Sequence, residues 1–264
     1  MPLLLSVVSI MAVIAAFACC ILTFRDKLEF FVGVIASSGL VLLAALVNIY
    51  RYNYLFGTDI ITETIDIQFN AISQFISQLP AEQLAGRFGG LTNESALSIY
   101  QQLNSLLDEI RQVYYLMFPS LLILNYLAIV FIVYMLIKQV LRIFKRDVSK
   151  YPEFSQLILQ RSAAIALAVS YVLPFFMSNT LTLAAVNNIS AIIGGVAFIC
   201  GVSFIDFRLR QRVKNAWLRF ALYIAVFFIS FTIIGIIAYI LILVAAFDSF
   251  VDYRHLRKKD VASG

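Results

Sequence analysis

Residues 162–205 read SAAIALAVSYVLPFFMSNTLTLAAVNNISAIIGGVAFICGVSFI, a run of 44 residues without one charged side chain. A helix needs about 20 predominantly apolar residues to cross the roughly 30 Å hydrocarbon core of a bilayer. This run is therefore long enough for two crossings, joined by a polar turn near Ser178, Asn179 and Thr180. The stretch predicts a helical protein that crosses a membrane more than once.

The whole chain of 264 residues has the same character. Apolar residues make up 62% of it and charged residues 13%, against roughly 45–50% and about 25% in soluble domains, and the mean hydropathy is +0.91. The net charge is +5, but the basic residues lie in short clusters between apolar runs, which argues against nucleic acid as a partner. We exclude a soluble globular protein and expect the lipid bilayer as the main partner.

Apolar stretches predict six membrane spans, or seven if the last one is broken. They lie near residues 3–24, 30–50, 113–137, 162–178, 182–205 and 220–247. The first stretch lacks the positive start of a secretory signal, so we expect a retained helix. The last has 28 uncharged residues, about 42 Å as one helix. One long helix and two short, tilted segments broken at or near Gly235 both remain open.

The segment between the second and third spans is different in character. Residues 51–112 carry a net charge of −4, so they lie outside the hydrocarbon. Apolar residues at helical spacing predict helices over 62–79 and 94–112, separated by Pro80 and a turn with Gly86, Gly89 and Gly90. We expect Thr92 or Asn93 to cap the second helix, which runs on into the next span.

These patterns together predict an all-α fold, a polytopic transmembrane helix bundle with an extramembrane amphipathic helical hairpin. The expected parts are an amino-terminal transmembrane hairpin (1–50), an extracytoplasmic amphipathic helical segment (51–112), a transmembrane bundle (113–250) and a basic carboxyl tail (251–264).

Charge sets the expected orientation. Residues 138–161 and residues 206–219 each carry a net charge of +4, and basic loops stay on the cytoplasmic side. Counting spans backwards places 51–112 and the amino terminus outside. A basic tail on the inside requires the broken form of the last span, which we favour. We expect a multi-pass protein of a bacterial cytoplasmic (inner) membrane.

Asparagines inside the predicted spans are the first candidates for a binding site. Asn125, Asn187 and Asn188 could line a small polar cavity, whereas the alternative for these residues and for Asn48 is that they join helices, since lipid offers an amide no partner. Pro119 and Pro174 could kink their helices. The small residues Gly194, Ala197 and Gly201 predict a close helix contact.

The sequence offers no sign of catalysis. Cys19, Cys20 and Cys200 lie in apolar runs without disulfide or metal spacing, and His255 is the only histidine. Phosphate-binding, nucleophile-elbow and zinc motifs are absent from the sequence, and no charged residue sits at the centre of a span. We expect no enzyme, no catalytic residue, no metal and no cofactor.

Charged residues after the last span form a second candidate site. Asp248, Asp252 and Arg254 either make a structural ion pair or anchor the helix end to anionic lipid. If the stretch is helical, Asp248 and Asp252 share a face, and Asp252 cannot meet Arg254. We expect a basic partner from another segment, the candidates being Arg208, Arg210 and Arg212.

Several motifs occur in a suggestive order between residues 60 and 259. They are VYYLMFPSLL at 113–122, the pair Asn125-Tyr126, the basic loop that follows it, and FDSFVDYRHLR at 247–257. In this order they resemble the YybS-like family of bacterial membrane proteins of unknown function. The resemblance implies a loose similarity to the substrate-binding subunits of energy-coupling-factor vitamin transporters.

Two functions therefore remain open. One is transporter-like binding or translocation of a small molecule of unknown identity. The other is a non-transport membrane scaffold for envelope or division partners, which would engage a membrane protein through the outer amphipathic segment.

Overall fold

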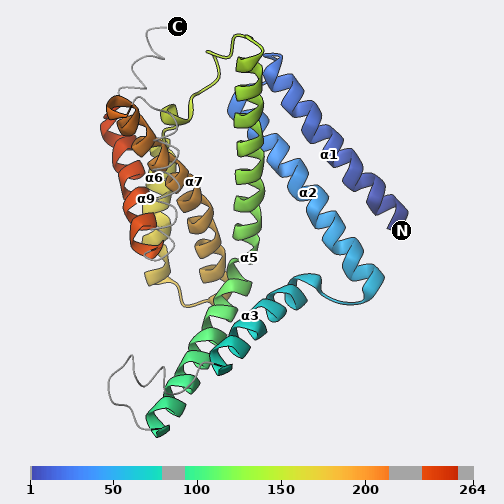
Figure 1. Ribbon diagram of the computed structural model, residues 1–264, viewed down its shortest axis with the longest axis vertical. Coiled ribbons are helices and arrows are strands. Elements are labelled where there is room, and N and C mark those ends of the chain that lie inside the picture. The colour runs from blue at the N-terminus through green and yellow to red at the C-terminus, as the bar shows by residue number, and fades with distance from the viewer. Residues whose placement is uncertain (1, 79–92, 214–233, 255–264) are drawn as a thin grey trace.

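A computed structural model describes residues 2–78, 93–213 and 234–254 of the chain. Within these ranges every regular element is a helix, which confirms the predicted all-α fold (Figure 1). Among the described residues, four helices are long and apolar enough to cross a membrane, and the two stretches Arg161–Phe176 and Ile237–Val251 are shorter apolar helices.

The first two helices form the expected hairpin. Helix α1 (Pro2–Phe24) and helix α2 (Phe30–Phe56) are joined by a short turn in which Asp26 has a positive φ of 61°. The helices approach so closely that a Cβ on Gly33 would lie 1.9 Å from Thr23 Oγ1. A hydroxyl group bridges the contact, since Ser37 of α2 donates to the Ala16 carbonyl of α1 at 3.0 Å.

The next two helices build an arm at the opposite end of the molecule from this turn. Helix α3 (Ile60–Gln78) runs back along the first part of helix α5 (Asn93–Ile143) (Figure 1). Their apolar stripes cover each other, with Ile65, Phe69 and Leu107 buried between them. The helices predicted at 62–79 and 94–112 are thus found within the described residues. Pro80, the glycine turn, Thr92 and residue 79 lie outside these residues.

Helix α5 continues from the arm into the bundle as one helix. Its 51 residues correspond to about 76 Å at 1.5 Å per residue, well beyond the roughly 40–45 Å of a whole bilayer. Pro119 lies near its middle. The predicted span 113–137 is therefore one part of a much longer helix.

The other described helices of the bundle are α6, η2, α7 and α9. Helix α6 (Arg161–Val172) passes into the 3₁₀ helix η2 (Leu173–Phe176), and helix α7 (Thr180–Arg212) lies beside helix α9 (Ile234–Val251) (Figure 1). Within the span predicted at 162–178 the α-helix reaches only from residue 162 to Val172, because the chain tightens to 3₁₀ at Leu173, directly before Pro174. Gly235 is helical within α9, and the question of one helix or two falls largely on residues 220–233, outside the described ranges.

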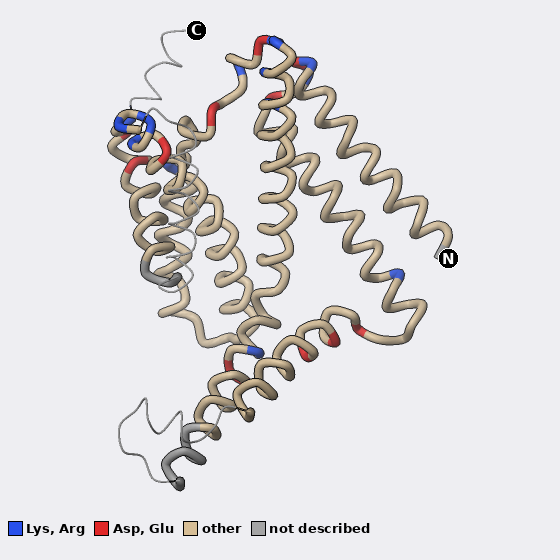
Figure 2. The backbone as a smooth tube through the Cα atoms, in the orientation of Figure 1, with Lys and Arg blue, Asp and Glu red and all other residues tan. Residues whose placement is uncertain are grey.

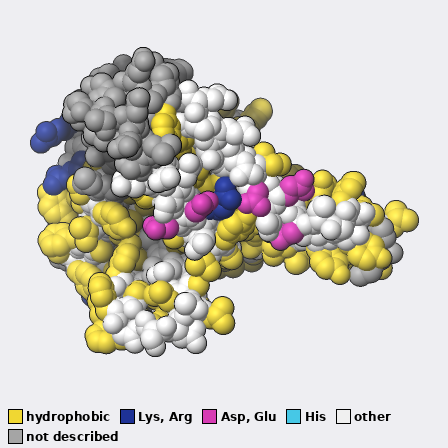
Figure 3. Space-filling model, turned by 90° about the horizontal axis from the view of Figure 1, so that it is seen from below, with side chains coloured by type: hydrophobic (Ala, Val, Ile, Leu, Met, Phe, Trp, Pro, Cys, Tyr) yellow, Lys and Arg dark blue, Asp and Glu magenta, His cyan; other side chains and the backbone are white. Residues whose placement is uncertain are grey.

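Charged residues gather at the two ends of the bundle (Figure 2). The turn after α1, the loop after α5, the end of α7 and the end of α9 all carry charges at one end, which we call the basic end. The residues that precede the carboxyl tail lie at this end too. From below, acidic side chains form a row across the opposite face (Figure 3).

Candidate functional site

A cavity of about 540 Å³ lies between α5, α6, α7 and α9. Its lining residues come from all four helices and from η2: Met117, Ser170, Tyr171, Pro174, Asn187, Ser190, Ala191, Gly194, Gly195, Phe198, Ala238, Tyr239 and Ile242. None of these residues is charged. The volume lies within the usual range of roughly 300–1,000 Å³ for small-molecule sites.

The polar groups of the cavity come from few side chains. Ser190 donates to the Val186 carbonyl at 2.9 Å and to the Ser170 carbonyl at 3.2 Å, so it holds α6 against α7. In the part of the chain that the structure describes, the Asn187 amide has no hydrogen-bond partner. The amide of Asn187 and the phenols of Tyr171 and Tyr239 are thus the polar groups that a ligand in this cavity would meet.

Asn188 has a different role from its neighbour. Its Nδ2 donates to the Leu116 carbonyl at 2.8 Å, and its Oδ1 accepts from the Ser120 N–H at 3.1 Å. These two backbone groups are four residues apart, the spacing of a helical pair, and they flank Pro119, which lacks the N–H that would bond to the Tyr115 carbonyl. The side-chain amide of α7 therefore bonds to two backbone groups of α5 on either side of the proline.

The three candidate asparagines do not form one site. Asn187 lines the cavity, and Asn188 is used to join α5 to α7. Asn125 is exposed on α5 and is not among the cavity residues. Asn48 joins α2 to α1, donating to Ser9 at 2.9 Å.

The small residues of α7 let its neighbours approach, as their spacing predicted. A Cβ on Gly201 would lie 2.2 Å from the Leu241 carbonyl oxygen of α9. A Cβ on Gly195 would lie 2.5 Å from Leu124 of α5. Ala197 is fully buried in the apolar core that α7 shares with α6 and α9. These close contacts hold α5 and α9 against α7, which forms one wall of the cavity.

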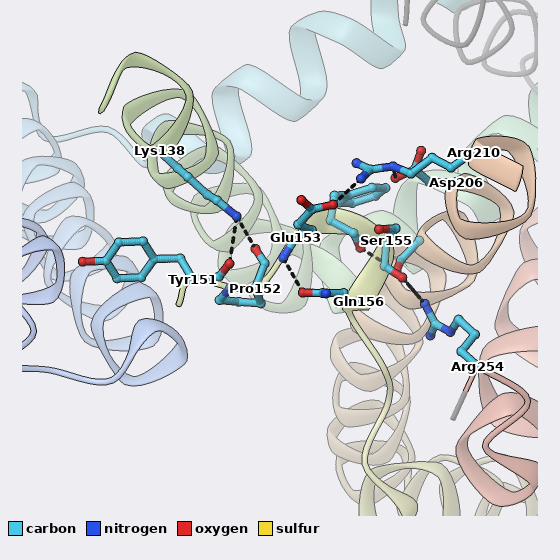
Figure 4. Close-up of polar contacts among 11 residues, drawn as sticks. Lys138, Tyr151, Pro152, Glu153, Ser155, Gln156, Asp206, Arg210 and Arg254 are labelled. Carbon is cyan, nitrogen blue, oxygen red and sulfur yellow. Dashed lines mark hydrogen bonds and ion pairs between the residues drawn. The ribbon is translucent and has the colours of Figure 1, made fainter. Parts of the chain in front are cut away.

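At the basic end a second polar region is built around the strap, which we define as residues 144–160 between α5 and α6. On one side the strap is bound to the α1–α2 turn, since Tyr151 donates to Asp26 Oδ1 at 3.0 Å and Lys150 pairs with the same carboxylate. Lys138 of α5 donates to the Tyr151 and Pro152 carbonyls at 2.8 and 3.1 Å (Figure 4).

The same contacts perturb two groups in these loops. The hydrogen bond from Lys150 holds the pKa of Asp26 below its usual value, and the bond from Tyr151 acts in the same direction. Burial raises the pKa of Tyr151 to about 12, with a further contribution from its bond to Asp26.

On its other side the strap is bound to α7. Glu153 pairs with Arg210, which also reaches Asp206 one turn earlier at 3.0 Å (Figure 4). Glu153 and Gln156 form a reciprocal capping box around the short 3₁₀ helix η1 (Phe154–Gln156). Ser203 of α7 donates to the Phe154 carbonyl at 2.6 Å.

Arg254 fastens the end of the α9 segment to the strap. Its Nε and Nη2 lie 2.9 and 2.8 Å from Asp248 Oδ2, while Nη1 donates to the Ser155 carbonyl at 2.8 Å and Nη2 to the Leu157 carbonyl at 2.7 Å. Arg254 is 6% exposed and Asp248 1%. With its donors satisfied inside the protein, Arg254 is not placed to anchor lipid.

The partner of Asp248 differs from our expectation. We expected an arginine of the 208–212 region, and the structure pairs Asp248 with Arg254. The reason is local, because α9 ends at Val251 and Asp252 has a positive φ of 49°. The chain turns back there, so helical spacing no longer applies. His255 and Arg257 lie outside the described residues.

Sequence reasoning missed several residues of these regions. Tyr171 and Tyr239 are aromatic residues in apolar runs, with nothing in the sequence to mark them as cavity residues. Lys138 and Tyr151 were visible only as part of a basic loop. In the ranges that the structure describes, no group of histidine, cysteine and acidic residues could hold a metal ion.

Comparison with known proteins gives a family and no closer relative. No curated protein and no solved structure matches the chain significantly. A family model described as "Predicted membrane protein (DUF2232)" matches residues 2–242. This match covers most of the apolar helices described above, the cavity and the strap. The chain therefore belongs to the DUF2232 family of predicted membrane proteins.

Proposed function

We propose that this membrane protein binds a small molecule in the cavity between α5, α6, α7 and α9, as a transporter-type protein does. The observation that carries the proposal is the cavity itself, which has a ligand-sized volume and places Tyr171, Asn187 and Tyr239 in its lining. Small-molecule sites are mostly apolar with a small number of precisely placed polar groups. The lining of this cavity has the same character.

The lining favours an uncharged ligand. An ion without a counter-charge is costly in an apolar cavity, and the lining supplies no charge. Asn187 offers both a donor and acceptor sites, while the two tyrosines offer hydroxyl groups and aromatic faces. A neutral molecule with a flat ring and an amide or hydroxyl group satisfies this set.

Interrupted helices beside the cavity support the transporter reading. Pro119 interrupts the hydrogen bonding of α5 next to the lining residue Met117, and Pro174 of η2 lines the cavity itself. Transporters place broken helices at their substrate sites, where the irregular backbone lines a cavity. The chain in this proposal binds and moves its ligand without chemical change.

The resemblance to YybS-like proteins and to substrate-binding subunits of energy-coupling-factor transporters points the same way and belongs to this proposal. We also propose that the protein lies in a bacterial cytoplasmic membrane with its basic end on the inside.

Cysteines introduced at Lys150 and Gln101 test the orientation, because an impermeant thiol reagent added to intact cells is expected to label position 101 alone. Labelling of position 150 alone reverses the orientation.

The binding test compares two asparagine variants. We expect native mass spectrometry of the purified protein to show a co-purified small molecule that Asn187→Leu loses and that Asn125→Leu retains. Asn125 is the matched control because it is an asparagine on a neighbouring helix, outside the cavity lining. Equal retention in both variants, or equal loss, contradicts binding in this cavity.

One observation favours the scaffold alternative. The arm exposes large apolar side chains, namely Ile67, Phe75, Leu106 and Ile110, each at least half exposed. A photo-reactive residue at Phe75 tests it, and a reproducible cross-link to one membrane protein that Ile67→Glu abolishes and Gln68→Glu preserves would favour a scaffold. Cross-links to lipid alone would count against it.

A further inference from the structure

A groove of about 420 Å³ lies between α7 and α9 at the basic end of the molecule, apart from the cavity described above. Its walls are Phe204 of α7 and Leu243, Val244 and Phe247 of α9, and it is closed by Asp248 and Tyr253. Phe247 is 66% exposed. An apolar groove that is open on the outside of a membrane helix pair is bordered by lipid chains.

Arg208 lies at the rim of this groove. Its guanidinium carbon is 4.3 Å from the centre of the Tyr253 ring and 5.9 Å from that of Phe204. Stacking on aromatic faces holds the guanidinium plane in place and leaves the N–H groups at its edge for a partner in that plane. No carboxylate among the described residues pairs with Arg208.

The acidic residues nearby are already engaged. Asp248 pairs with Arg254, Asp206 pairs with Arg210, and Asp252 has an interaction of its own. Arg208 is therefore a positive charge at the mouth of an apolar groove, on the end of the molecule where the basic loops lie. Anionic lipids concentrate in the cytoplasmic leaflet, and basic pockets between membrane helices bind their head groups.

We propose that this groove binds one anionic phospholipid, with the phosphate on Arg208 and an acyl chain along Phe204, Val244 and Phe247. The bidentate geometry of arginine suits a phosphate. The apolar walls favour a lipid over free phosphate, since a dissolved anion gains nothing from them. This site replaces Arg254 as the point of contact with lipid.

Native mass spectrometry in a neutral detergent tests the proposal by titration with phosphatidylglycerol and with phosphatidylcholine of the same chains. We expect the wild-type protein to bind phosphatidylglycerol more tightly, and Arg208→Gln to weaken that binding about five-fold, the equivalent of about 1 kcal/mol per basic residue. Arg212→Gln removes the same charge one turn further along α7 and is expected to change binding less than about two-fold.

A second variant acts on the walls. Val244→Phe fills the groove without changing any charge, and we expect it to weaken phosphatidylglycerol binding as well, so the test does not depend on the folding of Arg208→Gln. Equal losses in the Arg208 and Arg212 variants would show a diffuse charge effect and overturn the proposal. So would equal binding of phosphatidylcholine, or binding of soluble glycerophosphoglycerol as tight as that of the lipid.

Discussion

Replacing Asn188 with leucine removes the amide that bridges α5 beside Pro119. The substitution leaves the Ser120 N–H and the Leu116 carbonyl without the partners they have at 3.1 and 2.8 Å. A proline ring crowds the preceding turn of its helix, so we expect the turn that holds these two groups to be distorted and the groups to depend on the amide. Both groups face an apolar surrounding, where an unpaired backbone group is costly.

The expected cost follows from these two groups. An unsatisfied buried donor or acceptor costs about 1–3 kcal/mol, whereas hydrogen bonds between membrane helices measure about 0.6 kcal/mol on average and at most about 1.7. We therefore expect Asn188→Leu to lower the free energy of unfolding by about 1–3 kcal/mol. Asn125→Leu removes an exposed amide from α5 itself, and we expect it to change the free energy of unfolding by less than about 0.5 kcal/mol.

A double-mutant cycle with Pro119→Ala isolates the bridge. Alanine restores a regular turn in which Ser120 and Leu116 can pair, so in that background Asn188→Leu is expected to cost little. The coupling free energy should be about 1–2 kcal/mol, measured from unfolding of the protein in mixed detergent micelles. If Asn188→Leu costs the same with proline and with alanine at position 119, the bridging role is refuted.

Three further predictions concern other contacts. Arg254→Met leaves the buried Asp248 carboxylate unpaired and should lower the free energy of unfolding by about 3–5 kcal/mol, measured by chemical denaturation. Lys150→Met breaks an exposed pair, and its denaturation midpoint should stay close to that of the wild type. Gly201→Ala should destabilise the protein by about 1–3 kcal/mol, because its Cβ would overlap a backbone carbonyl of α9, while Gly39→Ala meets nothing within 4 Å and should be neutral or slightly stabilising in the same thermal melt. Tyr151 has a pKa of about 12 when folded and 10 as the reference, so the unfolded chain loses this proton first and stability should fall as the pH rises from 10 to 12. Tyr151→Phe should remove that part of the decline in denaturation curves measured across the same range, and an unchanged slope would contradict the assignment.

Some parts of this fold could be read from the sequence because they depend on local pattern. The absence of charge from 162–205 and the paired apolar stripes of the arm required helices and a membrane. The continuity of α5 followed from the lack of any breaking signal between residue 94 and Pro119. Each of these features is a property of neighbouring residues, so no spatial information was needed.

The site residues depended on contacts that sequence spacing does not contain. Asn187 and Asn188 are adjacent in the chain, yet a helix turns them in different directions, so one lines the cavity and the other bonds to the backbone of Ser120, 68 residues away. The partner of Asp248 was predicted wrongly for a different reason. Helical spacing was applied beyond Val251, where α9 ends and Asp252 has a positive φ.

The strap has a consequence for the order in which the protein is assembled. Its contacts with Asp26 use residues that a ribosome has already made when the strap emerges, but the contacts of Ser155 and Leu157 with Arg254 need a residue made about a hundred positions later. Until α9 has entered the bilayer, two buried carbonyls of the strap lack this donor. The strap therefore gains its full set of hydrogen bonds only after the last helix is in place. An unfinished chain differs from a finished one in the hydrogen bonding of this loop.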